Sequence, residues 1–223
     1  MKKLVFKFIT SFFAIVILVS STKAQKLNFL IPDGVLAQHA GSIGYFSGGI
    51  NYDLFKNKRG NLDFLYGFVP ANKGGAFSTL SSKFSYQPFE IKINRWIELY
   101  PVNPGAFLNY MISNDFNLTW PDGQYPRSYY YWSEALRAHL FFNNEIKFKL
   151  NQTNKNNIKS LSFYYEINTN DAYLVNFFQN NNSISIGEIF KSGFAFRLII
   201  QSEKEIGLFL QENGSKKLQA QTS

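Results

Sequence analysis

The sequence predicts an all-β chain, folded as an antiparallel up-and-down transmembrane β-barrel of about eight strands. Three features support this prediction. Apolar and polar residues alternate over many segments, which is the pattern of strands with one apolar and one polar face. Short polar connectors alternate with longer ones along the chain. The 24 Phe and 13 Tyr residues favour strands, and no helical period competes over a comparable length.

The first 24 residues predict a secretory signal peptide. Lys2 and Lys3 give a basic start, an apolar run follows at 8–19, and Thr22-Lys23-Ala24 forms a small-residue cleavage pattern. A retained membrane helix is the alternative, but the apolar run is short for a span. The expected organisation is a signal peptide at 1–24, a barrel domain at 25–200 and a polar C-terminal extension at 201–223.

Eight segments carry the strand pattern. In chain order they are 27–36, 42–55, 60–70, 77–89, 96–112, 134–149, 158–168 and 184–200. The first is the weakest, because Pro32 interrupts it and proline cannot donate to a ladder. The seven others each show one apolar face. These faces are Phe46, Ile50, Tyr52 and Leu54; Leu62, Phe64, Tyr66 and Phe68; Leu80, Phe84 and Tyr86; Leu108, Tyr110 and Ile112; Leu136, Ala138, Leu140 and Phe142; Leu161, Phe163, Tyr165 and Ile167; and Phe190, Phe194, Phe196, Leu198 and Ile200.

The connectors between these segments differ in length in a regular way. Those at 56–60, 90–95 and 151–157 are short and polar. Those at 70–76, 113–133 and 169–183 are longer, and the two kinds alternate. Short turns at the periplasmic end and longer loops outside are the expected asymmetry of a barrel in an outer membrane.

The apolar faces could form the core of a soluble β-protein or contact lipid. The predicted strands are about twice as long as the usual five or six residues, and a tilted membrane strand needs about 9–11 residues. Aromatic residues with polar tips also occur near the proposed rims, among them Trp96 and Tyr100. We therefore expect the apolar faces to contact lipid, with a soluble periplasmic β-protein as the rival fold.

The opposite faces carry charged residues that would then lie inside the barrel. An eight-stranded barrel is just wide enough for side chains to fill it, and buried charges must be paired. We expect an interior polar network of Asp63, Lys83, Arg137, His139, Glu145, Glu166 and Arg197.

These features together resemble those of a known group. The signal peptide, the eight alternating segments and the final strand SGFAFRL resemble small bacterial outer-membrane β-barrel proteins, over residues 27–200. LYGFVPANKGG and YPVNPGAFLNY resemble motifs of that group to which no chemistry is assigned. The resemblance implies a place in the outer membrane of a Gram-negative envelope. The partner is then outer-membrane lipid, with lipopolysaccharide as a candidate.

The end of the chain departs from that group. There the last barrel strand closes the chain with an aromatic residue, whereas 23 residues follow Ile200 here. The segment EIGLFL within them is an alternative closing strand.

The longest connector, residues 114–134, is the best candidate for a functional surface, because long loops in compact domains tend to be functional or disordered. Its aromatic residues and one arginine could contact lipid head groups. They are Trp120, Tyr125, Arg127, Tyr129, Tyr130, Tyr131 and Trp132. The alternative is that the rings only form the outer aromatic girdle.

The expected function is therefore that of a non-enzymatic outer-membrane barrel with a structural role or a role in binding through its loops. A narrow passive channel or transporter is the alternative. Nucleic acid is not expected as a partner, because removal of the signal peptide leaves 19 basic against 15 acidic residues. With two His and no Cys, we expect no metal site and no cofactor.

A lipid A-modifying enzyme is the less favoured alternative, and no catalytic residue is assigned. Barrel deacylases of this kind use a His, a nearby Ser and an acid on the barrel wall. The position two residues after His139 is Phe141, where that His-x-Ser pattern needs Ser. Ser162 and Glu166, on the next predicted strand, are the residues that could approach His139.

Overall fold

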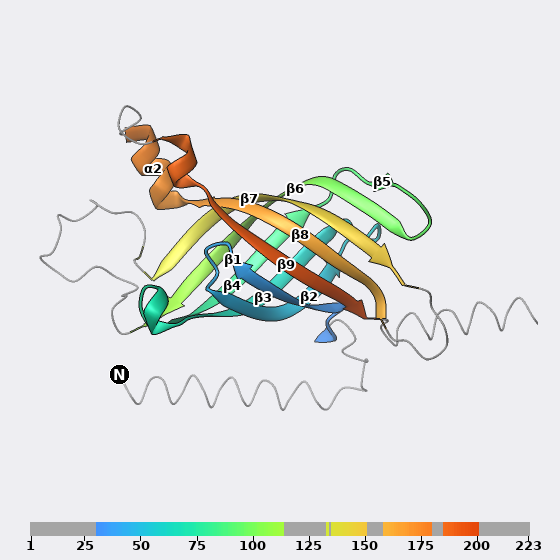
Figure 1. Cartoon of the computed structure of the whole chain (residues 1–223), viewed down its shortest axis with the longest axis horizontal. Helices are drawn as coiled ribbons and strands as arrows, with labels where there is room; N and C mark the ends of the chain where they lie inside the picture. The colour runs from blue at the N-terminus through green and yellow to red at the C-terminus, as the bar shows by residue number, and fades with distance from the viewer. Residues whose placement is uncertain (1–29, 114–132, 134, 151–157, 180–184, 201–223) are drawn as a thin grey trace, which may run out of the picture. The chain divides into compact units, whose positions relative to one another are not determined.

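The computed structural model describes residues 30–113, 133, 135–150, 158–179 and 185–200 (Figure 1). The chain divides into two compact units, Met1–Ile31 and Pro32–Ser223, and every element named here belongs to the second. Its strands are β1 (Gly34–Ala40), β2 (Phe46–Leu54), β3 (Gly60–Val69), β4 (Phe77–Tyr86), β5 (Ile91–Lys92), β6 (Ile97–Ile112), β7 (Leu136–Lys149), β8 (Ile158–Asn170) and β9 (Lys191–Ile200). The predicted signal peptide, C-terminal extension and EIGLFL segment lie outside the described residues.

The strands form a closed antiparallel barrel of eight strands, as predicted. The order is β4-β3-β2-β1-β9-β8-β7-β6, and pairing of β4 with β6 closes the ring. The two-residue strand β5 pairs with β6 outside this ring, as Ile91 lies opposite Leu99. A closed ring leaves none of the eight strands with an unpaired edge.

The first and last predicted strands are wrong in their bounds. β1 begins at Gly34, after Pro32, and not at residue 27. Proline lacks the N–H that a ladder requires, so the strand begins only beyond it. The closing strand β9 begins at Lys191 and not at 184, because residues 186–189 form a 3-10 turn, η3, with a capping box between Ser185 and Glu188.

The connector predicted at 169–183 contains a helix that the sequence analysis missed. Helix α2 (Asp171–Gln179) follows β8 directly. Its start is capped by the Asn170 side chain, whose Oδ1 accepts a hydrogen bond from the Tyr173 backbone N–H at 2.8 Å. A shorter turn, η2 (Ala71–Lys73), lies between β3 and β4. Within the described ranges, no helix has both the length and the apolar character that a membrane-spanning helix requires.

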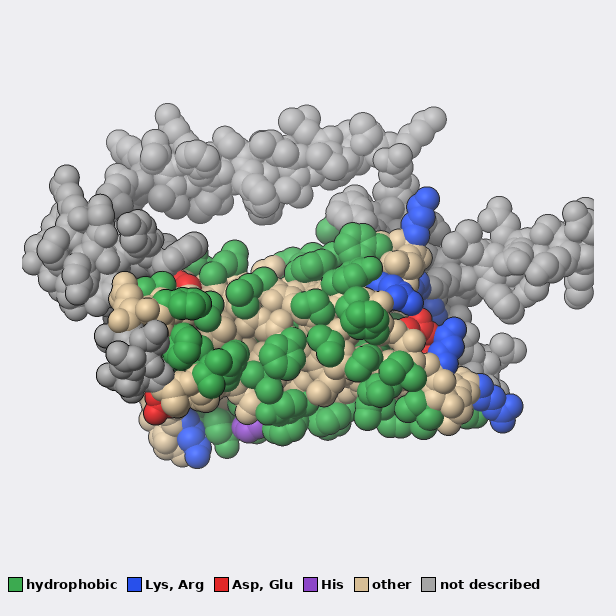
Figure 2. Space-filling model, turned by 90° about the horizontal axis from the view of Figure 1, so that it is seen from above, with side chains coloured by type: hydrophobic (Ala, Val, Ile, Leu, Met, Phe, Trp, Pro, Cys, Tyr) green, Lys and Arg blue, Asp and Glu red, His purple; other side chains and the backbone are tan. Residues whose placement is uncertain are grey.

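The polar faces of the strands point into the barrel and the apolar faces point outwards. In β8, Ser162, Tyr164 and Glu166 are fully buried, whereas Phe163 and Tyr165 between them are partly exposed. Among the described residues, 22 polar or charged residues are buried against 11 hydrophobic ones, the reverse of a water-soluble core. Figure 2 shows hydrophobic side chains over most of the barrel surface seen in that view.

The two ends of the barrel carry different connectors. The β1–β2, β3–β4, β6–β7 and β8–β9 connectors meet at one end, here called the long-loop end, where α2 lies (Figure 1). The β2–β3, β4–β6 and β7–β8 connectors meet at the other, here called the short-turn end. The connectors group at the two ends as the sequence predicted, but the difference in length is only partial: the β4–β6 connector (87–96) is longer than the β3–β4 connector (70–76).

The β1–β2 turn, residues 41–45, bends into the barrel. Ile43 is fully buried in an apolar cluster with Leu36, Leu65, Phe107 and Phe141. Glycine is required at Gly41 and Gly44, whose φ values are 77° and 139°.

Side chains from three strands hold this turn. Thr79 of β4 donates a hydrogen bond to the Ile43 carbonyl, Asn109 of β6 donates to the Ser42 carbonyl (3.0 Å), and Asn168 of β8 donates to the Gly41 carbonyl (2.8 Å). The turn therefore occupies the barrel interior below the long-loop end.

Candidate functional site: a charged barrel interior and its long-loop mouth

Charged side chains from three strands and a tyrosine from a fourth meet inside the barrel around Arg197. The Arg197 side chain is 2% exposed; its Nη2 lies 2.8 Å from Asp63 Oδ2 and its Nη1 lies 3.1 Å from Glu145 Oε2. The guanidinium carbon also lies 5.2 Å from the centre of the Tyr164 ring. Two carboxylates and an aromatic ring thus replace the water that the buried cation has lost.

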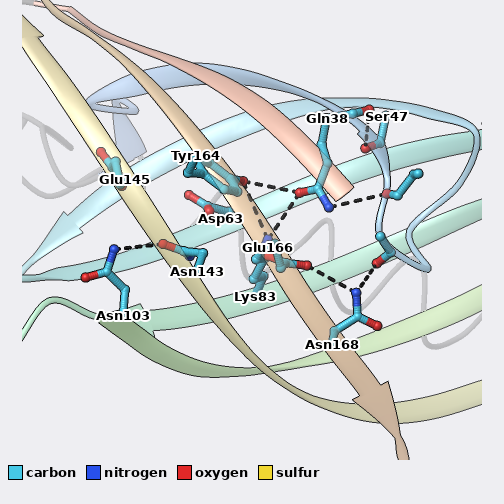
Figure 3. Close-up of polar contacts among 12 residues, drawn as sticks. Gln38, Ser47, Asp63, Lys83, Asn103, Asn143, Glu145, Tyr164, Glu166 and Asn168 are labelled. Carbon is cyan, nitrogen blue, oxygen red and sulfur yellow. Dashed lines mark hydrogen bonds and ion pairs between the residues drawn. The ribbon is translucent and has the colours of Figure 1, made fainter. Parts of the chain in front are cut away.

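A second charged cluster lies around Lys83. Its amino group forms an ion pair with Glu166 and donates a hydrogen bond to Gln38 Oε1 at 3.1 Å. The Tyr164 hydroxyl donates to the same Gln38 oxygen at 3.2 Å. Figure 3 shows these side chains converging from β1, β4 and β8. The Lys83 amino group lies 4.6 Å from the centre of the Phe141 ring, which adds a cation–π contact.

Together these residues form what we call the lumen network, which consists of Gln38, Asp63, Lys83, Glu145, Tyr164, Glu166 and Arg197. Its ion pairs join strands that are not neighbours in the ring, namely β9 with β3 and β4 with β8. Such pairs must cross the interior of the barrel. Side chains therefore occupy its cross-section at the level of the network.

Uncharged amides complete the hydrogen bonding of the network. Asn51 Nδ2 donates to Asp63 Oδ1 at 2.7 Å, and Gln87 Nε2 donates to Glu145 Oε2 at 3.1 Å. Only charged residues and His139 were predicted for the interior network, so these amides and Tyr164 were not among the predicted residues. Their positions in the alternating pattern could have identified them. Asn51 and Tyr164 lie on the inward faces of their strands, and Gln87 directly follows β4 and is also buried.

The seven residues proposed for the interior network separate into two groups. Asp63, Lys83, Glu145, Glu166 and Arg197 meet in the lumen network. His139 and Arg137 lie nearer the long-loop end. The His139 ring is 4% exposed and stacks on Phe107 at 4.2 Å, and Arg137 Nη1 lies 3.9 Å from Asp171 Oδ2.

The aromatic rim predicted from the sequence is partly wrong. Trp96 is exposed at the short-turn end, but Tyr100 is 7% exposed and its hydroxyl donates to Glu98 at 3.1 Å. Beyond it, a register shift between Tyr100 and Asn103 alters the alternation of β6. Tyr100 is therefore an interior residue. The loop residues Trp120, Tyr125, Arg127, Tyr129, Tyr130, Tyr131 and Trp132 lie outside the described residues.

The strand register separates the residues that a hydrolase would need. His139 lies opposite Asn170, whereas Ser162, eight positions before Asn170 in β8, lies opposite Lys147. Eight residues of a strand span about 26 Å, so the Ser162 hydroxyl cannot reach the His139 ring. Glu166, the third candidate, forms an ion pair with Lys83. These three residues therefore do not form a nucleophile, base and acid set.

A cavity of about 710 Å³ opens at the long-loop end. Its lining includes Lys73 over the Tyr45 ring, at 5.5 Å from the ring centre, and Lys191 over the Tyr173 ring, at 5.4 Å. Arg137 and His139 also line it. Within the part of the chain that the structure describes, His139 Nδ1 has no hydrogen-bond partner. Cations, aromatic rings and a buried ring nitrogen together suit an anionic ligand with polar groups.

No protein-family model, curated protein or solved structure matches the chain. Over the described ranges, no group of three or more His, Cys, Asp or Glu residues is placed to hold a metal ion. The candidate functions therefore depend on the barrel and on these sites alone.

Proposed function

We propose that this protein is a non-enzymatic outer-membrane barrel with a filled interior, and that it binds a ligand at its long-loop end. The observation that carries the proposal is the inverted distribution of side chains, with ion pairs inside and large apolar residues outside. Each of the eight barrel strands has at least one exposed large hydrophobic residue. The most exposed include Phe46 (63%), Leu140 (58%) and Phe196 (55%).

An apolar surface of this kind is costly in water. Soluble monomers rarely expose contiguous apolar patches larger than a few hundred Å², whereas these residues surround the barrel. Lipid would remove the cost, since hydrocarbon solvates Phe and Leu well. Export through a cleaved signal peptide remains an expectation from the sequence.

Aromatic residues at the two ends agree with a membrane boundary at each. Trp96 and Tyr86 are both 38% exposed near the short-turn end. Tyr66, 54% exposed, lies towards the long-loop end, where its hydroxyl hydrogen-bonds Ser78 at 2.7 Å. Trp and Tyr favour the interface because one end of the side chain is apolar and the other is polar.

Binding at the long-loop end is proposed from the cavity lined by Lys73, Arg137 and Lys191. The connector 114–134, predicted to be a functional surface, joins β6 and β7, whose ends lie at this mouth. Outer-membrane lipid is the partner class that this chemistry suits, with lipopolysaccharide phosphate as the candidate group.

A passive channel is the second candidate function, but the lumen network argues against it. The Arg197–Asp63 and Lys83–Glu166 pairs cross the interior, and an ion would have to displace them to pass.

Three measurements test the proposal. Cell fractionation and heat-modifiable gel mobility should place the protein in the outer membrane as a folded barrel; recovery in the soluble periplasmic fraction would reject this. Planar bilayers should show no steady conductance, and a stable ionic current would instead support the channel.

Purified lipopolysaccharide should bind the folded barrel, and the Lys73→Gln/Lys191→Gln variant should bind it more weakly. Equal binding by both would refute the proposed binding site.

A further inference from the structure

Helix α2 lies beside the first residues of β7, at the point where β8 leaves the sheet (Figure 1). Pairing of β7 with β8 begins at His139, which lies opposite Asn170, and α2 begins at the next residue, Asp171. Among the described residues, 136–138 of β7 therefore pair with β6 alone. An ion pair between Arg137 and Asp171, at 3.9 Å, joins β7 to α2 in place of a ladder. We call this junction the β7–α2 seam.

Two hollows lie on the two sides of the seam. The mouth cavity of about 710 Å³ lies on the inner side, and a groove of about 330 Å³ lies on the outer side. Arg137 of β7 and Tyr173 of α2 line the mouth cavity. The next residue along each element, Ala138 and Leu174, lines the groove, and His139 lines both hollows. The charged mouth and the outer face of the barrel therefore meet at the seam.

The groove on the outer side, here called the outer groove, is lined mostly by hydrocarbon. Small side chains make it hollow, since Ser82 of β4 and Ala138 of β7 each lie opposite Leu108 of β6. Leu108 and Leu140 are 50% and 58% exposed, so the groove belongs to the apolar outer face. Such a lining suits a hydrocarbon chain. Its outward-facing residues are Ser82, Ala106, Leu108, Ala138, Leu140 and Leu174.

We propose that the outer groove holds an acyl chain of the anionic lipid whose phosphate binds in the mouth cavity, so that the lipid lies across the β7–α2 seam. This rests on the proposed function and adds the apolar part of the ligand to it. Lys73, Arg137 and Lys191 suit phosphate, whereas the leucines and alanines of the groove suit hydrocarbon. A lipid carries both groups in one molecule, and a chain in the groove stays within the lipid layer. A phosphorylated sugar would occupy the mouth cavity alone.

The test compares two ligands that carry the same phosphates, namely lipid A and the disaccharide that remains when its acyl chains are removed. Each is added to the full-length folded protein in octyl glucoside, and its affinity is measured by native mass spectrometry. The variant Ala106→Phe fills the groove from β6. It should weaken binding of lipid A about fivefold, close to the loss of one buried methylene, and leave binding of the disaccharide unchanged.

The matched control is Ala37→Phe. Ala37 is also an exposed alanine on the outer face, but it belongs to β1 and does not line the groove. This variant should leave both affinities unchanged. An equal loss of lipid A affinity in the two variants would show a general effect of a bulky outer residue and overturn the groove. Unchanged lipid A affinity in a folded Ala106→Phe barrel would overturn it too.

A variant outside the sheet serves if Ala106→Phe does not fold. Leu174→Gln changes α2 and no strand, and it should weaken binding of lipid A without affecting the disaccharide. Equal binding of lipid A by Leu174→Gln and the unchanged protein would then overturn the proposal.

A second measurement locates the acyl chain directly. Lipid A with a diazirine near the end of one acyl chain should crosslink to α2 and to residues 136–142, and excess unlabelled lipid A should abolish these crosslinks. Crosslinks that spread evenly over the outer face and resist competition would overturn the proposal.

The disaccharide also separates this proposal from the proposed function. If it binds through Lys73 and Lys191 while the groove variants leave lipid A binding unchanged, the ligand site at the mouth stands and the acyl-chain groove alone is refuted. If neither lipid A nor the disaccharide binds, the ligand site at the mouth is refuted and the groove with it.

Discussion

An arginine scan along the outer face of β9 distinguishes a barrel in lipid from one in water. Phe196 lies at the middle of the strand, 55% exposed, opposite Ala37 of β1 and Phe163 of β8. Ile200 ends the same strand on the same face, 38% exposed. If the outer face contacts lipid, arginine costs about 2–4 kcal/mol at the midplane and about 0–1 kcal/mol near the interface. Phe196→Arg should therefore destabilise the barrel by about 2–3 kcal/mol more than Ile200→Arg does.

The measurement is reversible folding into phospholipid vesicles across a urea series, followed by tryptophan fluorescence and gel mobility. Phe196→Leu is the control for loss of the ring contact with Phe163, whose ring centre is 5.2 Å away. That contact is worth about 0.5–1.5 kcal/mol, so Phe196→Leu should fall well short of Phe196→Arg. In water, exposed substitutions usually change stability by about 0.5 kcal/mol or less. Equal, small effects at the two positions would refute the membrane argument.

Three further outcomes are expected. Arg197→Met should destabilise the fold by about 3–5 kcal/mol, because it leaves Asp63 and Glu145 buried without their cation. In urea unfolding, the triple variant Asp63→Asn/Glu145→Gln/Arg197→Met should recover much of that loss. A triple variant as unstable as the single variant would contradict the pairing. Asn168→Ala removes the hydrogen bond to the Gly41 carbonyl and should lower the free energy of unfolding by about 1–2 kcal/mol. It should also speed amide hydrogen exchange in the 41–45 turn. Unchanged exchange would show that other contacts hold the turn. Deletion of residues 203–223 should leave gel mobility and membrane assembly intact, because β9 ends at Ile200 and pairs with β1; loss of the folded band would place part of that segment in the barrel.

Much of the barrel follows from local pattern. Alternation has a period of two, so residues such as Phe194, Phe196 and Leu198 must share a face wherever the strand lies. Because successive strands run antiparallel, the order of the connectors along the chain likewise assigns each of them to one end without knowledge of any long-range contact. Three local features of the chain depart from this pattern. β1 begins only after Pro32, and a helix capped by Asn170 begins within a predicted loop. The register shift between Tyr100 and Asn103 interrupts the alternation of β6.

The charged site was predictable in composition but not in its pairing. The sequence by itself determined that Asp63, Lys83, Glu145, Glu166 and Arg197 share the polar faces of their strands. Only the tertiary structure decided that Arg197 joins Asp63 and Glu145 while Lys83 joins Glu166. It also separated His139 from Ser162 and brought Leu174 of α2 into one groove with Ala106 of β6. The physical reason is that a side chain's face depends on its immediate neighbours in the chain, whereas its partner depends on strand order, register and ring closure, which bring together residues far apart in sequence.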